Sequence, residues 1–261
     1  MSDIITERSE AILRVQLNRP ATKNAMTSAM YITLAELFDG AAKDDDIRVV
    51  LWHGAGDSFC AGNDIADFIK NPPGAGESPQ ALLMKALIDF DKPIVAAVHG
   101  AAIGGGTTML THCDFVYAGE SAKFQMPFVN LALVPEFGSS CTVPARAGYL
   151  RAAELILTGQ SFDAREAAEL GVVTRVVPNQ ELLATATDTA QKLAQKPPAA
   201  LRACKRLMRQ STREQLERAV KLENEEFAVR VRSAEAREAF SAFLEKRQPN
   251  FSGMKEPVTH T

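Results

Sequence analysis

Short apolar runs rich in Val, Ile and Leu alternate, over the first two thirds of the chain, with stretches whose apolar residues recur every three or four positions. The short runs predict buried strands at 11–17, 47–52, 93–98, 114–119 and 172–177. The longer stretches predict helices at 26–43, near 79–90, from about 105, near 149–158 and at 163–170. Strands and helices that alternate in this way pair in parallel through right-handed crossovers. We therefore expect an α/β fold with a largely parallel sheet.

One apolar segment is long enough to be considered as a membrane span. Residues 93–110, PIVAAVHGAAIGGGTTML, contain no charged side chain. Four glycines and a proline disfavour one continuous helix there. The segment divides better into a buried strand, a glycine turn and the start of a helix, so we expect no membrane association.

Two changes in character divide the chain further. Residues 70–80, KNPPGAGESPQ, are rich in Pro and Gly and predict a mobile loop, a candidate lid. From Pro197 onward the sequence predicts charged helix, which either meets another subunit or is a solvated tail. The apolar positions of this helix are Leu216, Val220, Phe227 and Val231. We therefore divide the chain into a core at 1–196 and a helical region at 197–261.

Composition limits the ligand and the compartment. The 261 residues, 46% of them hydrophobic, can bury a large core, while the net charge of −3 offers no positive field for nucleic acid or an anionic membrane. A small acyl compound is the better expectation. The cysteines form no CxxC motif and predict buried free thiols in a reducing compartment. They are Cys60, Cys113, Cys141 and Cys204. The N-terminal MSDIITERSE has no apolar signal region, so we expect a cytoplasmic protein.

Several familiar kinds of site are excluded by inspection. The sequence has no GxSxG, no HExxH and no GK[ST], and its histidine spacing indicates no metal site. Two glycine turns are left, FCAGNDI at 59–65 and HGAAIGGGTTML at 99–110, each after a predicted buried strand. Such turns expose backbone N–H groups, and two of them converging on one oxygen form an oxyanion hole. Alternatively, the glycines only allow a strand and a helix to pack closely.

A single acidic residue lies in the uncharged stretch LVPEFGSS, 133–140. One interpretation is that Pro135 opens a helix and that Glu136, in its first turn, interacts with the positive end of the helix dipole. The other interpretation is that Glu136 is a catalytic base. The stretch by itself favours the first.

Six motifs in the same order resemble the crotonase, or enoyl-CoA hydratase/isomerase, superfamily. They are NRPATKNAM (18–26), FCAGNDI (59–65), VHGAAIGGG (98–106), PFVNLALVPEFGSS (127–140), TGQSFDAREAAELGVV (158–173) and FLEKRQPNF (243–251). The resemblance implies a crotonase-like spiral of repeated ββα units with a C-terminal α-helical trimerisation region. It also implies a homotrimer or a hexamer built as a dimer of trimers, and a coenzyme A thioester as substrate without a metal or redox cofactor.

The resemblance also implies roles for individual residues. The N–H groups of Asn63 and Gly105 would form the oxyanion hole, and carbonyls around Ala61 and Asn63 would receive the adenine of coenzyme A. Asp64 and Ile65, from the same motif, are further candidate substrate-binding residues. An Asp at this position also fits a helix cap. Phe128 would pack against the acyl chain. Lys23, Lys246 and Arg247 are candidate phosphate contacts.

The reaction depends on which acids are present. Hydratases of this superfamily use two glutamates, and this sequence has Thr108 and Phe128 at their places, neither of which transfers protons near neutral pH. The "PE" before "SS" and the "GND" turn are similar to peroxisomal-type Δ3,Δ2-enoyl-CoA isomerases, in which one glutamate suffices. The resemblance therefore favours an isomerase with Glu136 as base. The alternatives are a hydratase or hydrolase that activates water through Glu136, and a non-catalytic acyl-CoA-binding protein.

Overall fold

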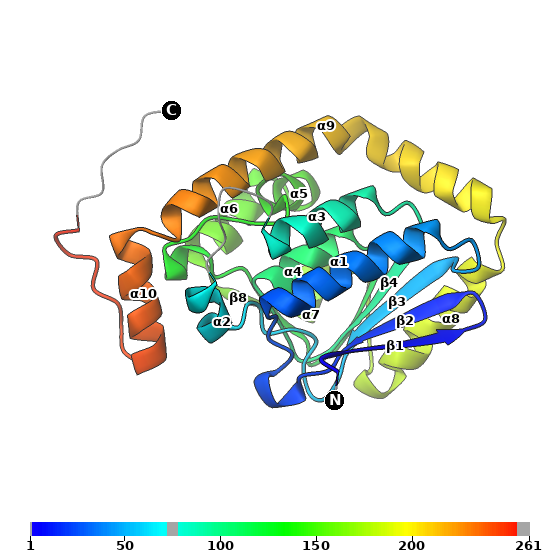
Figure 1. Ribbon diagram of the computed structural model, residues 1–261, viewed down its shortest axis with the longest axis horizontal. Coiled ribbons are helices and arrows are strands. Elements are labelled where there is room, and N and C mark those ends of the chain that lie inside the picture. Colours follow the sequence, from blue (N-terminus) through cyan, green and yellow to red (C-terminus); the bar gives the residue numbers. More distant parts are fainter. Residues whose placement is uncertain (1, 72–77, 255–261) are drawn as a thin grey trace.

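The computed structural model describes residues 2–71 and 78–254, and its strands form two sheets (Figure 1). The six-stranded sheet has the order β1 (Ile4–Ser9), β2 (Ile12–Leu17), β3 (Val49–Gly54), β4 (Ile94–Val98), β6 (Phe115–Gly119) and β9 (Arg175–Val177). The second sheet contains β5 (Ala101–Ile103), β7 (Lys123–Gln125) and β8 (Ser161–Asp163). Except for β1, which runs antiparallel to β2, the large sheet is parallel, as the sequence predicts.

From β4 to β7, consecutive strands contribute alternately to the two sheets, and this produces the spiral. β4 and β6 belong to the large sheet, whereas β5 and β7, which follow them directly, belong to the small one. Helices continue each pair of strands: α4 (Gly105–Thr108), α5 (Ser139–Ala147), α6 (Tyr149–Thr158) and α7 (Ala164–Glu169). The expected spiral of ββα units is therefore confirmed.

The large sheet is covered on both faces. Val50 and Trp52 of β3 belong to the apolar cluster formed with α1 (Ser28–Lys43) and α3 (Pro79–Asp89). Their neighbours Val49 and Leu51 belong to the cluster formed with α8 (Leu182–Ala194). Because successive side chains of a strand point to opposite faces, a strand buried on both sides reads as a continuous apolar run.

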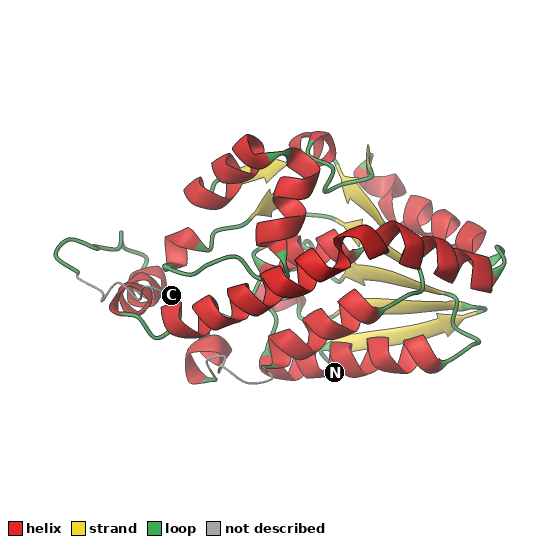
Figure 2. Cartoon of the chain, turned by 90° about the horizontal axis from the view of Figure 1, so that it is seen from above, coloured by secondary structure: helices red, strands yellow, loops and turns green. Residues whose placement is uncertain are grey.

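The C-terminal part of the chain consists of α9 (Pro198–Arg230) and α10 (Ala234–Glu245). Seen from above, α9 crosses the molecule toward α10 (Figure 2). A buried ammonium group attaches α9 to the core, since Lys205 Nζ donates to Lys92 O at 2.6 Å and to Asp114 Oδ2 at 2.7 Å. α9 begins one residue after Pro197, where the composition changes.

Several sequence predictions can be compared with these elements. α6 has the predicted bounds, and the uncharged segment 93–110 forms β4, β5 and α4 and then enters a short 3-10 helix. In the part of the chain that the structure describes, no helix is long and apolar enough to cross a membrane. The loop predicted at 70–80 is too long, because Lys70 ends α2 (Ile65–Lys70) and Pro79 and Gln80 begin α3. Its residues 72–77 lie outside the described residues.

The cysteine prediction is only partly confirmed. Cys60 and Cys113 are buried free thiols, but Cys141 is half-buried and Cys204 is exposed. The prediction for Cys204 is wrong because this residue lies on a solvent-facing side of α9, where the apolar Leu207 and Met208 one turn further on are exposed as well.

Candidate active site

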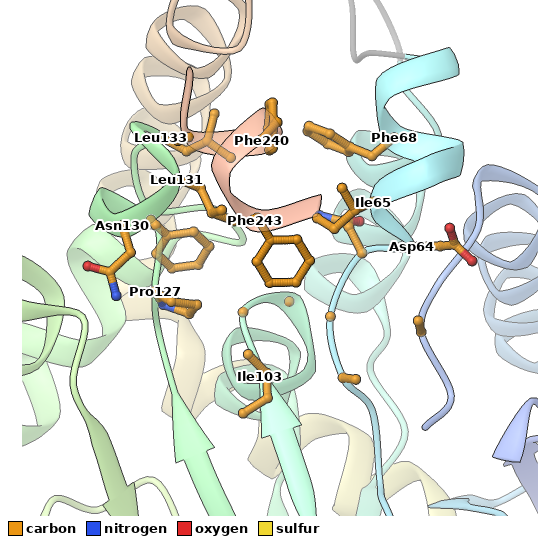
Figure 3. Close-up of a pocket in the computed structure, with 18 of the residues that line it drawn as sticks. Asp64, Ile65, Phe68, Ile103, Pro127, Asn130, Leu131, Leu133, Phe240 and Phe243 are labelled. Carbon is orange, nitrogen blue, oxygen red and sulfur yellow. The ribbon is translucent and has the colours of Figure 1, made fainter. Parts of the chain in front are cut away.

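A cavity of about 610 Å³ lies between the glycine turns, the segment around Phe128 and the C-terminal helices. Its lining is largely apolar, and Figure 3 shows Phe68 of α2 and Phe240 and Phe243 of α10 around a common space. The larger apolar side chains are Ile65, Phe68, Ile103, Phe128, Leu131, Leu133, Phe227, Phe240 and Phe243. Such a lining suits an aliphatic or aromatic ligand group, oriented by a few polar atoms.

The first polar atom of the cavity is the backbone N–H of Asn63. Residue 63 forms a bridge with Met26, in which Met26 N donates to Gly62 O and Asp64 N donates to Met26 O. In this pattern, the N–H and C=O of Asn63 itself point away from Met26. Among the described residues, the Asn63 N–H has no acceptor. It is therefore a free donor in the cavity wall.

The second free donor is the N–H of Gly105, the first residue of α4. The first N–H groups of a helix have no acceptor within the helix, and no other described residue accepts from Gly105. The preceding Gly104 has φ 55° and ψ −121°, a conformation that side chains disfavour, so glycine is required at the turn that opens this N–H to the cavity.

Glu136 lies directly above Gly105. A Cβ atom placed on Gly105 would be 3.0 Å from Glu136 Oε1, which has no hydrogen-bond partner among the described residues. The side chain lines the cavity although the residue is only 5% exposed. Burial, with a smaller effect of the nearby Glu223 carboxylate, raises the pKa of Glu136 to about 8. An unpaired carboxyl group with such a pKa can exchange a proton with a ligand near neutral pH.

The backbone places Glu136 before a helix rather than in one. α5 begins at Ser139, so the predicted helix start at Pro135 is wrong, and with it the prediction that Glu136 lies in a first helical turn. Phe137 and Gly138 have φ values of 58° and 69°, and these left-handed residues separate Glu136 from the helix. Its carboxylate therefore receives no hydrogen bond from the helix N-terminus.

Glu223 of α9 occupies that N-terminus instead. Its carboxylate accepts from Gly138 N at 2.7 Å and from Ser140 N at 2.8 Å. Glu223 belongs to none of the sequence motifs. The signal was available, because an acidic residue stands between Val220 and Phe227 on the apolar stripe of the predicted helix.

Tyr31 is a second residue of the site that belongs to none of the sequence motifs. Its hydroxyl donates to Asn63 Oδ1 at 2.8 Å and would lie 3.1 Å from a Cβ on Gly105. Burial, with a contribution from Glu136, raises the pKa of Tyr31 above its usual value, so the phenol stays protonated. Tyr31 thus fixes the side chain of Asn63 from inside α1. No sequence signal distinguished it from the other buried residues of this helix.

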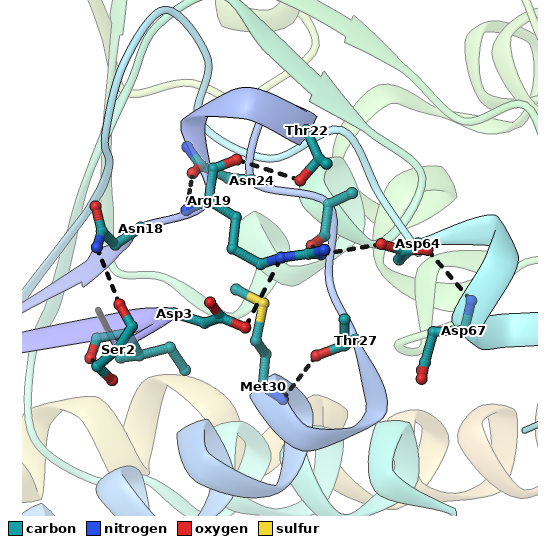
Figure 4. Close-up of polar contacts among 12 residues, drawn as sticks. Ser2, Asp3, Asn18, Arg19, Thr22, Asn24, Thr27, Met30, Asp64 and Asp67 are labelled. Carbon is teal, nitrogen blue, oxygen red and sulfur yellow. Dashed lines mark hydrogen bonds and ion pairs between the residues drawn. The ribbon is translucent and has the colours of Figure 1, made fainter.

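Asp64 lines the cavity but is engaged in structural contacts (Figure 4). Its carboxylate accepts from Asp67 N at 3.2 Å, as the N-cap of α2, and pairs with Arg19 at 3.0 Å. Arg19 also donates to Ala25 O at 2.6 Å. The helix cap considered from the sequence is therefore confirmed.

The remaining predicted residues are not all in the cavity wall. Ala61, Ile65, Phe128 and Arg247 line the cavity. Lys23 and Lys246 are exposed and do not.

Arg247 is held at the mouth of the cavity by acidic neighbours. It forms two contacts with Glu238, at 2.5 and 3.0 Å, and one with Glu245 at 2.6 Å. The hydrogen bonds from Arg247 and from Asn250 N lower the pKa of Glu238 to about 2. A ligand phosphate would have to compete with Glu238 for this guanidinium group.

Thr108 and Phe128, the positions at which the resemblance implies the two glutamates of a hydratase, carry no acid. Thr108 is fully buried and its hydroxyl bonds to Gly104 O at 3.3 Å, while Phe128 presents a phenyl ring to the cavity. Among the described residues that line the cavity, the only carboxylates are Asp64 and Glu136. Since Asp64 is paired, Glu136 is the one acid in the wall that is free to move a proton.

Known proteins with similar sequences and structures indicate the family to which this chain belongs. The family model described as enoyl-CoA hydratase/isomerase matches residues 7–254. A 2,3-dehydroadipyl-CoA hydratase of Escherichia coli (strain K12) is 34% identical, over 97% of this chain and all of its own. Enoyl-CoA delta isomerase 2 of Homo sapiens is 36% identical, over 82% of this chain and 56% of its own.

The solved structures point to the same family. A crystal structure of an enoyl-CoA hydratase/isomerase from Pseudoalteromonas atlantica T6c is 40% identical and superimposes with a TM-score of 0.91, covering 96% of this chain and 100% of that chain. Together with the family model that matches almost the whole length, this shows that the protein belongs to the enoyl-CoA hydratase/isomerase family and has its crotonase fold.

Proposed function

We propose that the protein is an acyl-CoA isomerase that converts 3-enoyl-CoA into trans-2-enoyl-CoA, with Glu136 as its only proton carrier. The observation that carries this proposal is the buried, unpaired Glu136 Oε1 above Gly105, in a cavity whose described wall contains no second free carboxylate. Double-bond migration needs one proton to leave C2 and one to arrive at C4. A single carboxylate can carry out both transfers.

The chemistry begins with the carboxylate of Glu136. It takes a proton from C2, the electrons move into the thioester to form a dienolate, and the carboxyl group returns the proton at C4. A base is effective when its pKa lies near the working pH, and burial raises the pKa of Glu136 to about 8. Activity should therefore increase with pH up to about 8, because only the ionised form accepts the proton.

The dienolate needs stabilisation at its oxygen. The free N–H groups of Asn63 and Gly105 are suited to donate to this oxygen and form an oxyanion hole. Each donor of this kind contributes on the order of 3 kcal/mol to the transition state. Both donors belong to turns held by backbone hydrogen bonds to Met26 and to Gln125, so little reorganisation is needed when the charge develops.

The coenzyme A part of the substrate would lie toward the mouth of the cavity. We assign Ala61, Asp64 and Ile65 to its neighbourhood, and Lys23, Lys246 and Arg247 to its phosphates. The acyl chain would extend along Phe128 and the apolar lining. No metal or redox cofactor takes part in this scheme.

A trimer, or a hexamer of two trimers, is part of the same proposal. Large apolar side chains on the outside of α9 support it: Leu207 and Met208 are 73% and 72% exposed in the single chain. Light scattering during size-exclusion chromatography measures the assembly, and a monomeric mass would contradict this part.

A hydratase reaction is the second candidate, because relatives that match 93% to 97% of this chain bear hydratase names. In that case Glu136 would activate a water molecule for addition at C3. The missing acids at positions 108 and 128 favour the isomerase.

The two candidates are separated by assaying wild type and Glu136→Gln with 3-enoyl-CoA and with trans-2-enoyl-CoA. We expect isomerase activity in the wild type and a decrease in kcat on the order of 10²- to 10⁴-fold in the variant. Wild-type hydration without isomerisation would favour the hydratase. Isomerase activity that survives the substitution would reject Glu136 as base. Calorimetric binding of a CoA ester without any turnover would indicate a non-catalytic binding protein.

A further inference from the structure

The peptide group that follows Phe137 is held at both of its polar atoms by residues distant in sequence. His112, at the end of the 3-10 helix Met109–His112, contacts Phe137 O through Nε2 at 2.7 Å. Since a carbonyl oxygen only accepts, Nε2 carries the proton. On the other side, Gly138 N donates to Glu223 Oε2 at 2.7 Å. The carbonyl and the N–H of one peptide group are thus fixed from opposite directions.

This peptide group lies between two left-handed residues. Phe137 has φ 58°, a conformation that non-glycine residues adopt only when the surroundings impose it. Gly138 has φ 69°, and a Cβ there would approach Leu216 Cδ1 of α9 to 2.3 Å. The turn therefore depends on α9 for its shape and directly follows Glu136.

We propose that Glu223 is a positioning residue for Glu136, and that it holds, together with His112, the left-handed turn that directs the Glu136 carboxylate over Gly105. Glu223 acts through the backbone of residues 138 and 140 and does not line the cavity. The inference rests on the proposed function, in which Glu136 is the base.

The charges around Glu136 determine how this role can be recognised. Tyr31 of α1, Cys60 in the turn after β3, and Glu223 of α9 are the titratable groups that interact with it. Burial raises the pKa of Tyr31 and of Cys60, so both remain neutral. His112 is neutral as well, because burial lowers its pKa to about 4. Among the described residues, Glu223 is the neighbour whose negative charge raises the pKa of Glu136. Burial raises the pKa of Glu223 itself, and the hydrogen bonds from Ser140 and Gly138 oppose that shift by favouring the charged form.

The first test uses Glu223→Gln, which removes the charge and one of the two acceptors. We expect kcat for isomerisation to decrease by 10- to 100-fold, on the order expected for a misplaced catalytic group, while KM changes little. The acid limb of the pH–kcat profile should also move to lower pH, because the neighbouring negative charge is gone. Glu225→Gln is the matched control on the same helix, since Glu225 is exposed and pairs only loosely with Lys221, at 3.9 Å.

The second test separates position from charge through His112. His112→Leu removes the donor to Phe137 O and leaves the charge unchanged, so kcat should decrease without movement of the acid limb. His112→Gln keeps an N–H donor at a similar reach, so it should restore much of the activity. Far-UV circular dichroism and thermal unfolding of each variant show whether it is folded.

Crystal structures of the Glu223→Gln and His112→Leu variants provide a readout that does not depend on activity. The proposal predicts that φ at Phe137 leaves the left-handed region, or that the Glu136 carboxylate moves off Gly105. Folded variants with an unchanged turn, kcat and pH profile would overturn the role of Glu223. In contrast, an inactive wild type, or full activity of Glu136→Gln, would overturn the proposed function while these structures still report on the turn.

Discussion

The inner end and the mouth of the cavity differ in how their polar groups are satisfied. At the inner end, the N–H groups of Asn63 and Gly105 and the Oε1 of Glu136 have no partner among the described residues. At the mouth, Arg247 is paired with Glu238, and in the wall next to Asn63 the carboxylate of Asp64 is paired with Arg19. Both ends carry charged or polar groups, but only the inner ones are left free to meet a ligand.

The unpaired groups at the inner end lower the free energy of unfolding. A buried polar atom without a partner costs free energy, and native structures keep such atoms where a ligand or a reaction uses them. Paired groups at the mouth contribute to local structure at little cost. Substitutions at the inner end should therefore change kcat and pH dependence, whereas those at the mouth should act weakly and on KM.

The largest effect is expected for the pH dependence of stability at the inner end. The pKa of Glu136 is raised in the folded state from 4.5 to about 8, so the folded protein binds the proton more tightly than the unfolded chain does. Stability from this group is complete below pH 4.5 and is lost as the pH rises to about 8. Denaturant unfolding measures the free energy of unfolding of both proteins. The value for Glu136→Gln should increase relative to that of wild type by a few kcal/mol as the pH rises from 5 to 9. Glu225→Gln should show no such gain, and an equal pH response of the two variants would contradict the assignment.

Gly105→Ala should have the next largest effect. The new Cβ would lie 3.0 Å from Glu136 Oε1 and 3.1 Å from the Tyr31 hydroxyl, so the carboxylate must shift away from the reacting atoms. We expect kcat to decrease by about 100-fold in a steady-state assay. The control is Gly40→Ala in α1, where a Cβ meets nothing within 4 Å and alanine should favour the helix. An active Gly105→Ala variant would show that the inner end tolerates displacement.

Tyr31→Phe should have a moderate effect. It removes the hydrogen bond to Asn63 Oδ1 and costs about 1 kcal/mol, which corresponds to roughly a fivefold lower kcat if the position of Asn63 loosens. Tyr117→Phe is a suitable control, because the Tyr117 hydroxyl bonds to Thr189 on the α8 face of the sheet. Tyr117→Phe should lower the free energy of unfolding by a similar amount and leave kcat and KM unchanged. If kcat were the same in both variants, Tyr31 would have no role in positioning Asn63.

The smallest effect is expected at the mouth, for Arg247→Ala. If Arg247 releases Glu238 to contact a phosphate, loss of the side chain removes binding that is equal in ground and transition states. KM for the CoA ester should then increase by about threefold to tenfold with unchanged kcat. Arg8→Ala, which breaks a comparable exposed pair with Asp44 away from the cavity, should leave both constants unchanged. A lower kcat in Arg247→Ala would contradict the division between inner end and mouth.

Local patterns in the sequence determined much of the fold. Burial of one helix face or of both strand faces imposes a period on the apolar residues, and this period gave α6 its bounds and separated β4 from α4. The strands β1, β5, β7 and β8 were not predicted, since β1 is largely polar and the others are only three residues long. They depend on pairing partners that a local pattern does not reveal.

Some features of the site were also predictable from local sequence, and others were not. The glycine motifs indicated where backbone N–H groups are exposed, since the left-handed or crowded turns there admit only glycine. The sequence also directed attention to Glu136, although its expected position in a first helical turn is wrong. The N-terminus of α5 is occupied by Glu223 instead, which lies 85 residues beyond Gly138 in the sequence. Glu136 is therefore held before the helix.

The sequence by itself determined the alternation of strands and helices, the turns that require glycine, and the absence of acids at positions 108 and 128. These features are local, because they depend on the period of burial or on the conformational freedom of single residues. Only the tertiary structure decided which polar groups are left unpaired. Tyr31, Glu136 and Glu223 come from distant segments, and their partners are set by packing across the fold rather than by neighbours along the chain.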